Sequence, residues 1–172
     1  TVYVGGIILK NNEFLVVAGS TRAMGDGYGC AEGDDEDGYL TLLDPATGEL
    51  LQGRENNERY GTEEDAVVRW IWYDPNDTNR IYIVGATKGD NDGIQDDELD
   101  ITPGSSQGFI SKINLTTLHE RWTVQWGAHL ADSVTSNYAL GCHVEAGVVY
   151  VAGVVGNSAG MVQGQDILQS HG

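Results

Sequence analysis

A short apolar stretch, IYIVGAT at residues 81–87, occurs three times in this chain of 172 residues with only modest changes. An earlier copy reads FLVVAGST at 14–21, and a later copy reads VYVAGV at 149–154. The copies share a central glycine, and these glycines lie 66 and 68 residues apart: Gly19, Gly85 and Gly153. A self-similar stretch at a nearly fixed period is the sequence signature of a repeat architecture.

Two further elements recur in step with this stretch. DGYLTLLD at 37–44 matches QGFISKIN at 107–114, and a short apolar element precedes each copy. All are rich in β-branched and aromatic residues and are bounded by turn formers, which is typical of strands. No segment has a convincing helical pattern. One full repeat therefore predicts four strands, near 67–73, 80–86, 107–114 and 119–126.

Four antiparallel strands at a fixed period are typical of the blade of a β-propeller. We therefore expect an all-β chain of four-stranded antiparallel blades, about two and a half in number. The blades would span 1–60 and 61–130, with a partial blade at 131–172. Because repeat units need neighbours to bury their faces, we expect a piece of a longer polypeptide. Its partners would be other blades or subunits of a larger assembly.

Four segments of the second repeat form a series: YIVGAT at 82–87, DITPG at 100–104, GFISKIN at 108–114 and WTVQWG at 122–127. This series resembles the SBBP-type β-propeller repeat over about one repeat. It departs from that family at Gln107 and in its very acidic loops. LDPATGELL at 43–51 is similar, more weakly, to hairpins of quinoprotein-type propeller blades. Both resemblances imply a propeller fold.

The chain is strongly acidic, with 26 Asp and Glu against 9 Lys and Arg and a formal net charge of −17. A nucleic-acid binder needs a basic face to neutralise phosphates. Adsorption to anionic lipid also needs positive charge. No apolar run approaches the roughly 20 residues that span a bilayer. We therefore expect no nucleic-acid partner and no insertion into a membrane.

Two predicted loops, at 32–37 and 89–100, together hold 11 of the 26 acidic residues. Clustered carboxylates with glycine at the bend suit Ca²⁺, which takes six to eight oxygen ligands. The predicted ligands are Asp34, Asp35, Asp37, Asp90, Asp92, Asp96, Asp97 and Glu98. The second loop is not an EF-hand, because that frame puts Lys88 at position one and Leu99 at position twelve. The alternative is an acidic loop that only keeps the protein in solution.

Two kinds of covalent modification are also indicated. Sequons begin at Asn76 and Asn114, in or beside predicted hairpin turns, where N-glycans can be carried. Cys30 and Cys142 are too few for a disulfide framework. Three fates stay open for them: a bridge to each other, pairing with cysteines outside this sequence in an oxidising compartment, or buried thiols.

No catalytic constellation is recognisable in the sequence. The four histidines lack metal-ligand spacing, and the serines lack a nucleophile-elbow context. Trp70 and Trp72 alternate with Ile71, and packing between blades explains them better than a sugar-binding platform. We expect a non-enzymatic structural or adhesive module, extracellular or at the cell surface, with calcium-binding loops and N-glycans.

Two other functions stay open at this point. One is a fragment of a propeller enzyme, either a hydrolase or a quinoprotein-like oxidoreductase, whose site would draw residues from many blades. The other is a carbohydrate-binding propeller, with Tyr28 and Tyr39 as the candidate aromatic contacts.

Overall fold

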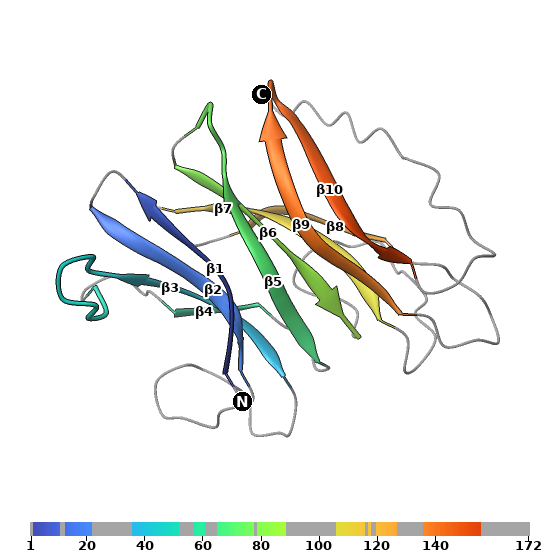
Figure 1. Ribbon diagram of the computed structural model, residues 1–172, viewed down its shortest axis with the longest axis horizontal. Helices are drawn as coiled ribbons and strands as arrows, with labels where there is room; N and C mark the ends of the chain where they lie inside the picture. The colour runs from blue at the N-terminus through green and yellow to red at the C-terminus, as the bar shows by residue number, and fades with distance from the viewer. Residues whose placement is uncertain are drawn as a thin grey trace.

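The computed structural model describes residues 2–10, 13–21, 36–51, 57–60, 65–77, 79–88, 106–115, 117, 120–126 and 136–155. Within these ranges the chain is all-β: the regular elements are antiparallel strands, and none is a helix (Figure 1). The described residues accordingly contain no helix long and apolar enough to cross a membrane. The expected all-β class is confirmed.

The strands form three antiparallel sheets in chain order. The first sheet holds β1 (Val2–Lys10), β2 (Phe14–Thr21), β3 (Asp37–Leu43) and β4 (Asn57–Tyr60). The second sheet holds β5 (Ala66–Tyr73), β6 (Arg80–Thr87), β7 (Gln107–Asn114) and β8 (Glu120–Trp126). The third sheet, as far as the described residues reach, holds β9 (Asn137–Glu145) and β10 (Val148–Val155).

The four strands predicted for the second repeat are confirmed within about one residue at each end. β4 is not expected from the sequence, because its four residues, NERY, carry no apolar alternation. Pairing with β3 rather than a hydrophobic pattern defines this short strand.

The second sheet lies between the other two and contributes one face to each of two apolar clusters. Along β6, Ile81 and Ile83 pack with the first sheet, whereas Tyr82 and Val84 pack with the third sheet. Successive side chains of a strand point to opposite faces, so a strand buried on both faces becomes continuously apolar. This explains why the repeated stretch shows no alternation of apolar and polar residues.

An irregular residue in the first strand explains the repeated glycines. The register of β5 with β6 shifts between Val68 and Trp70, and that of β9 with β10 shifts opposite Gly153. A β-carbon on Gly85 would lie 1.9 Å from the carbonyl oxygen of Val67. One on Gly153 would lie 2.1 Å from the carbonyl oxygen of Tyr138. β-Bulges bend one strand towards its partner, and only glycine leaves room for this approach.

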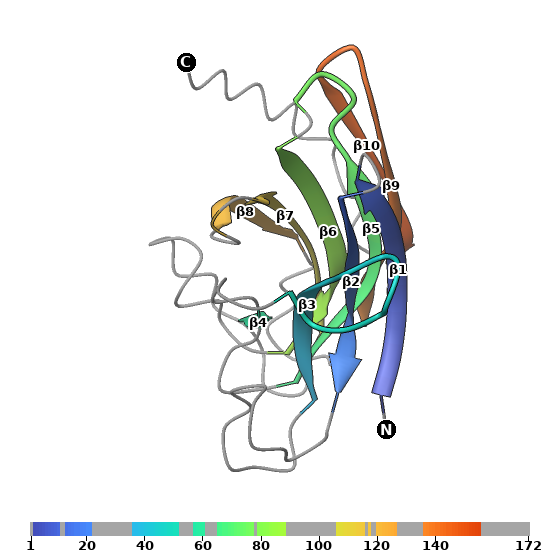
Figure 2. The same cartoon turned by 90° about the vertical axis from the view of Figure 1, so that its left-hand side faces the viewer.

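The sheets are also joined by a repeated backbone hydrogen bond. Ala66, the first residue of β5, donates its N–H to the carbonyl oxygen of Glu36, 2.5 Å away. Asn137, the first residue of β9, donates its N–H in the same way to Ser106, at 3.0 Å. Glu36 and Ser106 each precede the third strand of the preceding sheet. β1, β5 and β9 consequently run side by side, with β4 and β8 on the opposite side of the molecule (Figures 1 and 2).

Candidate functional site

The predicted calcium ligands lie almost entirely outside the described residues, in 22–35 and 89–105: Asp34, Asp35, Asp90, Asp92, Asp96, Asp97 and Glu98. Asp37 is described as the first residue of β3, where it is buried and pairs with Thr21. In the part of the chain that the structure describes, no three His, Cys, Asp or Glu side chains form a group that could hold a metal ion. The calcium site stays a prediction.

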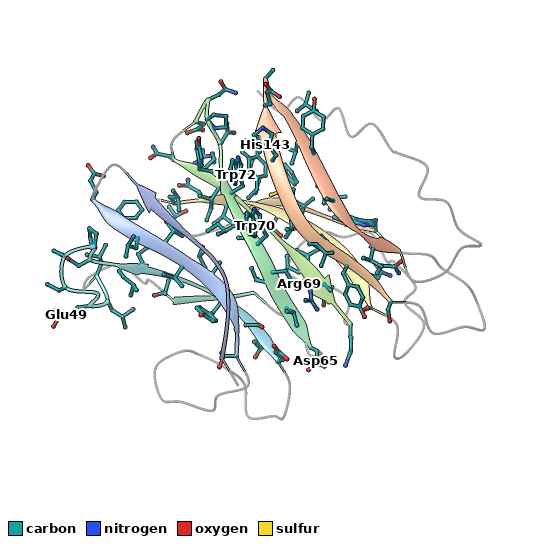
Figure 3. The ribbon with its side chains drawn as sticks, viewed as in Figure 1. Glu49, Asp65, Arg69, Trp70, Trp72 and His143 are labelled. Carbon is teal, nitrogen blue, oxygen red and sulfur yellow. The ribbon has the colours of Figure 1, made fainter. Side chains whose placement is uncertain are left out.

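Asp65 joins the first and second sheets through Glu36 and Lys88, which border the two acidic loops. Its Oδ1 accepts a hydrogen bond from the N–H of Glu36 at 2.8 Å, and its Oδ2 lies 2.5 Å from Nζ of Lys88. Oγ of Ser20 donates to Oε1 of Glu36 at 2.7 Å. Figure 3 shows Asp65 at the start of β5. Since the Lys88 side chain is half exposed, this ion pair adds little stability and mainly holds the Asp65 carboxylate in place.

A second polar network lies at the other end of the second sheet, beside the turn between β5 and β6. Asp74 Oδ1 accepts the N–H of Asn76 at 2.9 Å, while its Oδ2 accepts from Tyr82 Oη at 3.2 Å and from Lys112 Nζ at 3.3 Å. The Lys112 ammonium also lies 5.2 Å from the centre of the Tyr82 ring. The network therefore joins the turn to β6 and β7.

Burial and bonding act in opposite directions on the Asp74 carboxyl. Burial by itself raises its pKa, but the Asn76 N–H, the Lys112 ammonium and the Tyr82 hydroxyl together outweigh burial, so the pKa lies below the ordinary 3.8. Burial likewise lowers the pKa of Lys112, and its contacts with Tyr82 and Asp74 raise it by more. Both groups are therefore charged at neutral pH, and the buried carboxylate is fully paired.

Replacing Asp74 with asparagine should produce a pH-dependent loss of stability. Because the folded pKa is depressed, the contribution of Asp74 is complete above pH 3.8 and is lost as the pH falls through the lower folded value. At pH 7 we expect Asp74→Asn to lower the free energy of unfolding by about 2 kcal/mol. Urea unfolding at pH values from about 2 to 7 measures the difference, which should shrink below pH 4.

Asp77→Asn is the matched control for this prediction. Asp77 lies in the same turn, is more exposed, and pairs with Arg80 at 3.6 Å. Exposed ion pairs contribute little, so we expect a loss of about 0.5 kcal/mol or less. A difference between wild type and Asp74→Asn that stayed constant across the whole pH range would contradict the assigned network.

The two sequons differ in accessibility. Asn76 is exposed in the turn between β5 and β6, whereas Asn114 ends β7 and is 9% exposed. Arg80 pairs with Asn114, and Thr87 pairs with Gln107, so both sequons lie at the end of the sheet opposite its acidic loop. Glycans are bulky surface groups, and the burial of Asn114 disfavours one there. Asn76 remains the predicted site.

Cys142 has a free thiol that is buried against the second sheet. Burial raises the pKa of this thiol to about 12, so the reactive thiolate is scarce at neutral pH. Cys30 lies outside the described residues. Of the three fates that the sequence leaves open, Cys142 has that of a buried thiol in this structure.

Three of the four tryptophans pack between the second and third sheets. Trp72, Trp122 and Trp126 pack against the cluster that contains Cys142 and Val144. The Trp72 ring lies 5.3 Å from the ring of His143 on β9, in an edge-on arrangement (Figure 3). Trp70 is more exposed, although Figure 3 places it on the same strand. Packing between sheets therefore accounts for Trp72. Of the two tyrosines that the sequence offers for sugar binding, Tyr39 lies on β3 and is partly buried, and Tyr28 lies outside the described residues.

The outward face of the third sheet carries exposed apolar side chains. We define it by the side chains of β10 that alternate with Val149, which packs against the second sheet: Val148, Tyr150 and Val154. Tyr150 is 56% exposed, and Val148 and Val154 are each exposed by nearly half. A contiguous apolar patch of this kind marks an interaction surface more often than an isolated exposed side chain does.

No protein-family model matches the chain, and no curated protein matches it. Asp65 and Asp74 bond strands and turns together, and the aromatic side chains fill the space between sheets.

Proposed function

We propose that this chain is a segment of a β-propeller that acts as a structural or adhesive scaffold rather than as an enzyme. The observation that carries this proposal is a repeated contact between sheets. β5 lies against β1, β2 and β3, and β9 lies against β5, β6 and β7. Sheets that meet through equivalent strands continue the same rotation from one sheet to the next. Radial repetition of this kind builds a propeller and leaves only short sheet edges.

The distribution of polar groups supports a scaffold. Asp65 and Asp74 are both committed to turns and neighbouring strands through several bonds. The exposed sequon at Asn76 and the net charge of −17 suit an extracellular or cell-surface protein. We therefore assign the chain to the secretory pathway, with a glycan on Asn76.

Calcium binding by the two acidic loops is part of the same proposal. Glu36 enters the first sheet from one loop, Lys88 leaves the second sheet for the other, and both bond to Asp65. Loops that start from one fixed junction have less freedom to lose when they bind a common ion. The 11 carboxylates of 32–37 and 89–100 are the oxygen ligands that Ca²⁺ prefers.

Calcium should stabilise the folded chain measurably. At a free concentration one hundred times its dissociation constant, Ca²⁺ should raise the free energy of unfolding by about 2.7 kcal/mol. We expect the triple variant Asp90→Asn, Asp92→Asn, Asp96→Asn to lose this gain. Isothermal titration of the chelator-treated chain, together with urea unfolding with and without Ca²⁺, measures both quantities.

A matched control removes three carboxylates elsewhere. Glu13, Glu49 and Glu145 are exposed and lie outside the two loops. Changing all three to glutamine lowers the net negative charge equally and should leave the calcium effect intact. An equal stabilisation by Mg²⁺, or equal losses in the two triple variants, would indicate general charge screening and would refute a calcium site.

A further inference from the structure

The outward face of the third sheet repeats the face by which the second sheet contacts the third. Counting from the aligned glycines Gly85 and Gly153, Tyr82 corresponds to Tyr150, and Val84 to Ala152. Their cross-strand partners also correspond, because Tyr82 pairs with Trp72 and Tyr150 pairs with His143. Tyr82 is 4% exposed beneath the third sheet, whereas Tyr150 is 56% exposed. The third sheet thus presents an interaction face without a described partner.

The first sheet shows the same relation one step earlier. Val16 and Ala18, the counterparts of Tyr82 and Val84, are fully buried against the second sheet. Two successive sheets therefore use the same strand positions to receive the next one. The outward face of the third sheet should therefore bind a surface like the one that the second sheet presents to the first. That face carries Val68, Ile71, Ile81, Ile83, Phe109 and Ile113.

The chain carries a second example of such a face, on the opposite side of the first sheet. By register, Leu15 corresponds to Ile81, Tyr39 to Phe109 and Leu43 to Ile113. Leu15, Tyr39 and Leu43 are only partly buried, and Leu50, which bridges to Leu43, is exposed, whereas Val17, the counterpart of Ile83, is 8% exposed. The first sheet thus carries, at these partly buried positions, the residue types of the face that the second sheet presents to it.

We infer that the outward face of the third sheet docks the first sheet of a second copy of this chain, head to tail. This inference rests on the proposed function, since it extends the contact between blades to a contact between chains. A heterologous contact of this type closes into a ring when its rotation allows and otherwise forms an open filament. The buried surfaces are apolar, whereas each copy carries a net charge of −17. Association should therefore tighten as added salt screens the repulsion between copies.

Sedimentation equilibrium of the wild-type chain over a range of protein and salt concentrations tests the inference. We expect association that increases with both. Tyr150→Glu places a charge on the receiving face and should weaken association about thirtyfold or more. Tyr73→Glu makes the same change at an exposed tyrosine of the second sheet and should leave association unchanged. Circular dichroism and urea unfolding confirm that each variant is folded.

A mixing experiment distinguishes head-to-tail docking from pairing of two third sheets. Leu15→Glu places a charge on the donating face, and Leu50→Glu is the substitute if that variant does not fold. Tyr150→Glu and the donating-face variant should each be monomeric, yet form a one-to-one dimer when mixed, because each retains one intact face. Self-association of the donating-face variant alone would overturn the inference.

A wild-type chain that stays monomeric at every salt concentration would also overturn the docking inference. That result would leave the proposed function standing, because calcium binding by the acidic loops is measured on the single chain. A chain that associates but does not bind calcium would leave the docking inference standing and would refute the calcium-binding part of the proposed function. The two failures are therefore distinguishable.

Discussion

Gly85→Ala should destabilise the chain by about 3 kcal/mol, an effect at the upper end of those caused by overpacking. The new β-carbon would lie 1.9 Å from the carbonyl oxygen of Val67 and 2.9 Å from Cε1 of Phe109. The first contact is with backbone and cannot be relieved by a side-chain rotation. Relief requires β5 to move away from β6, which removes the bulge that lets Val68 and Ile71 both face the first sheet. Urea unfolding measures the loss.

Gly141→Ala is the control for this prediction. Gly141 also lies within a strand, but an added β-carbon would meet only Cγ of Trp70, at 3.9 Å, which is an ordinary contact. Its effect should be less than about 1 kcal/mol and could be stabilising, since alanine loses less backbone entropy than glycine. Gly153→Ala, in contrast, should resemble Gly85→Ala, because its β-carbon would lie 2.1 Å from the Tyr138 carbonyl oxygen. Equal effects at Gly85 and Gly141 would refute the role assigned to the bulge.

The repeat in the sequence predicted the strands well, but it did not predict the bulge. Spacing alone identified Gly19, Gly85 and Gly153 as equivalent. A regular strand would place Val68 on the same face as Trp70, whereas the shifted register places Val68 with Ile71. A bulge is a pairing of two residues against one, and no local sequence signal marks the extra residue, Arg69.

The polar networks could not be predicted from the sequence, for a different reason. Asp74 and Lys112 are 38 residues apart, and Ser20 and Glu36 are 16 apart, so only the register of the strands brings them together. The turn that contains Asp74 was predictable from its proline and its aspartates, because these residues set the local backbone directly. The acidic loops were equally conspicuous in the sequence. Their calcium-binding role stays a prediction, which the calcium titration described above tests.

Ile83→Ala should cost about 3 kcal/mol, because it removes a fully buried side chain from the cluster shared by the first and second sheets. A double-mutant cycle turns this loss into a test of how the sheets are layered. Ile83 and Leu42 belong to the same cluster but to different sheets, so their losses should be non-additive by about 0.5 kcal/mol or more. Urea unfolding of the two single variants and the double variant gives the coupling.

Val144 provides the control cycle, because it is equally buried but packs on the opposite face of the second sheet. Residues without shared partners have additive effects to within about 0.5 kcal/mol, so Ile83→Ala and Val144→Ala should simply add. Coupling of Ile83 to Val144, with none to Leu42, would mean that the second sheet faces its neighbours the other way round. The order of layers would then differ from that of the structure, and the equivalence between Tyr82 and Tyr150 would lose its meaning as a docking relation.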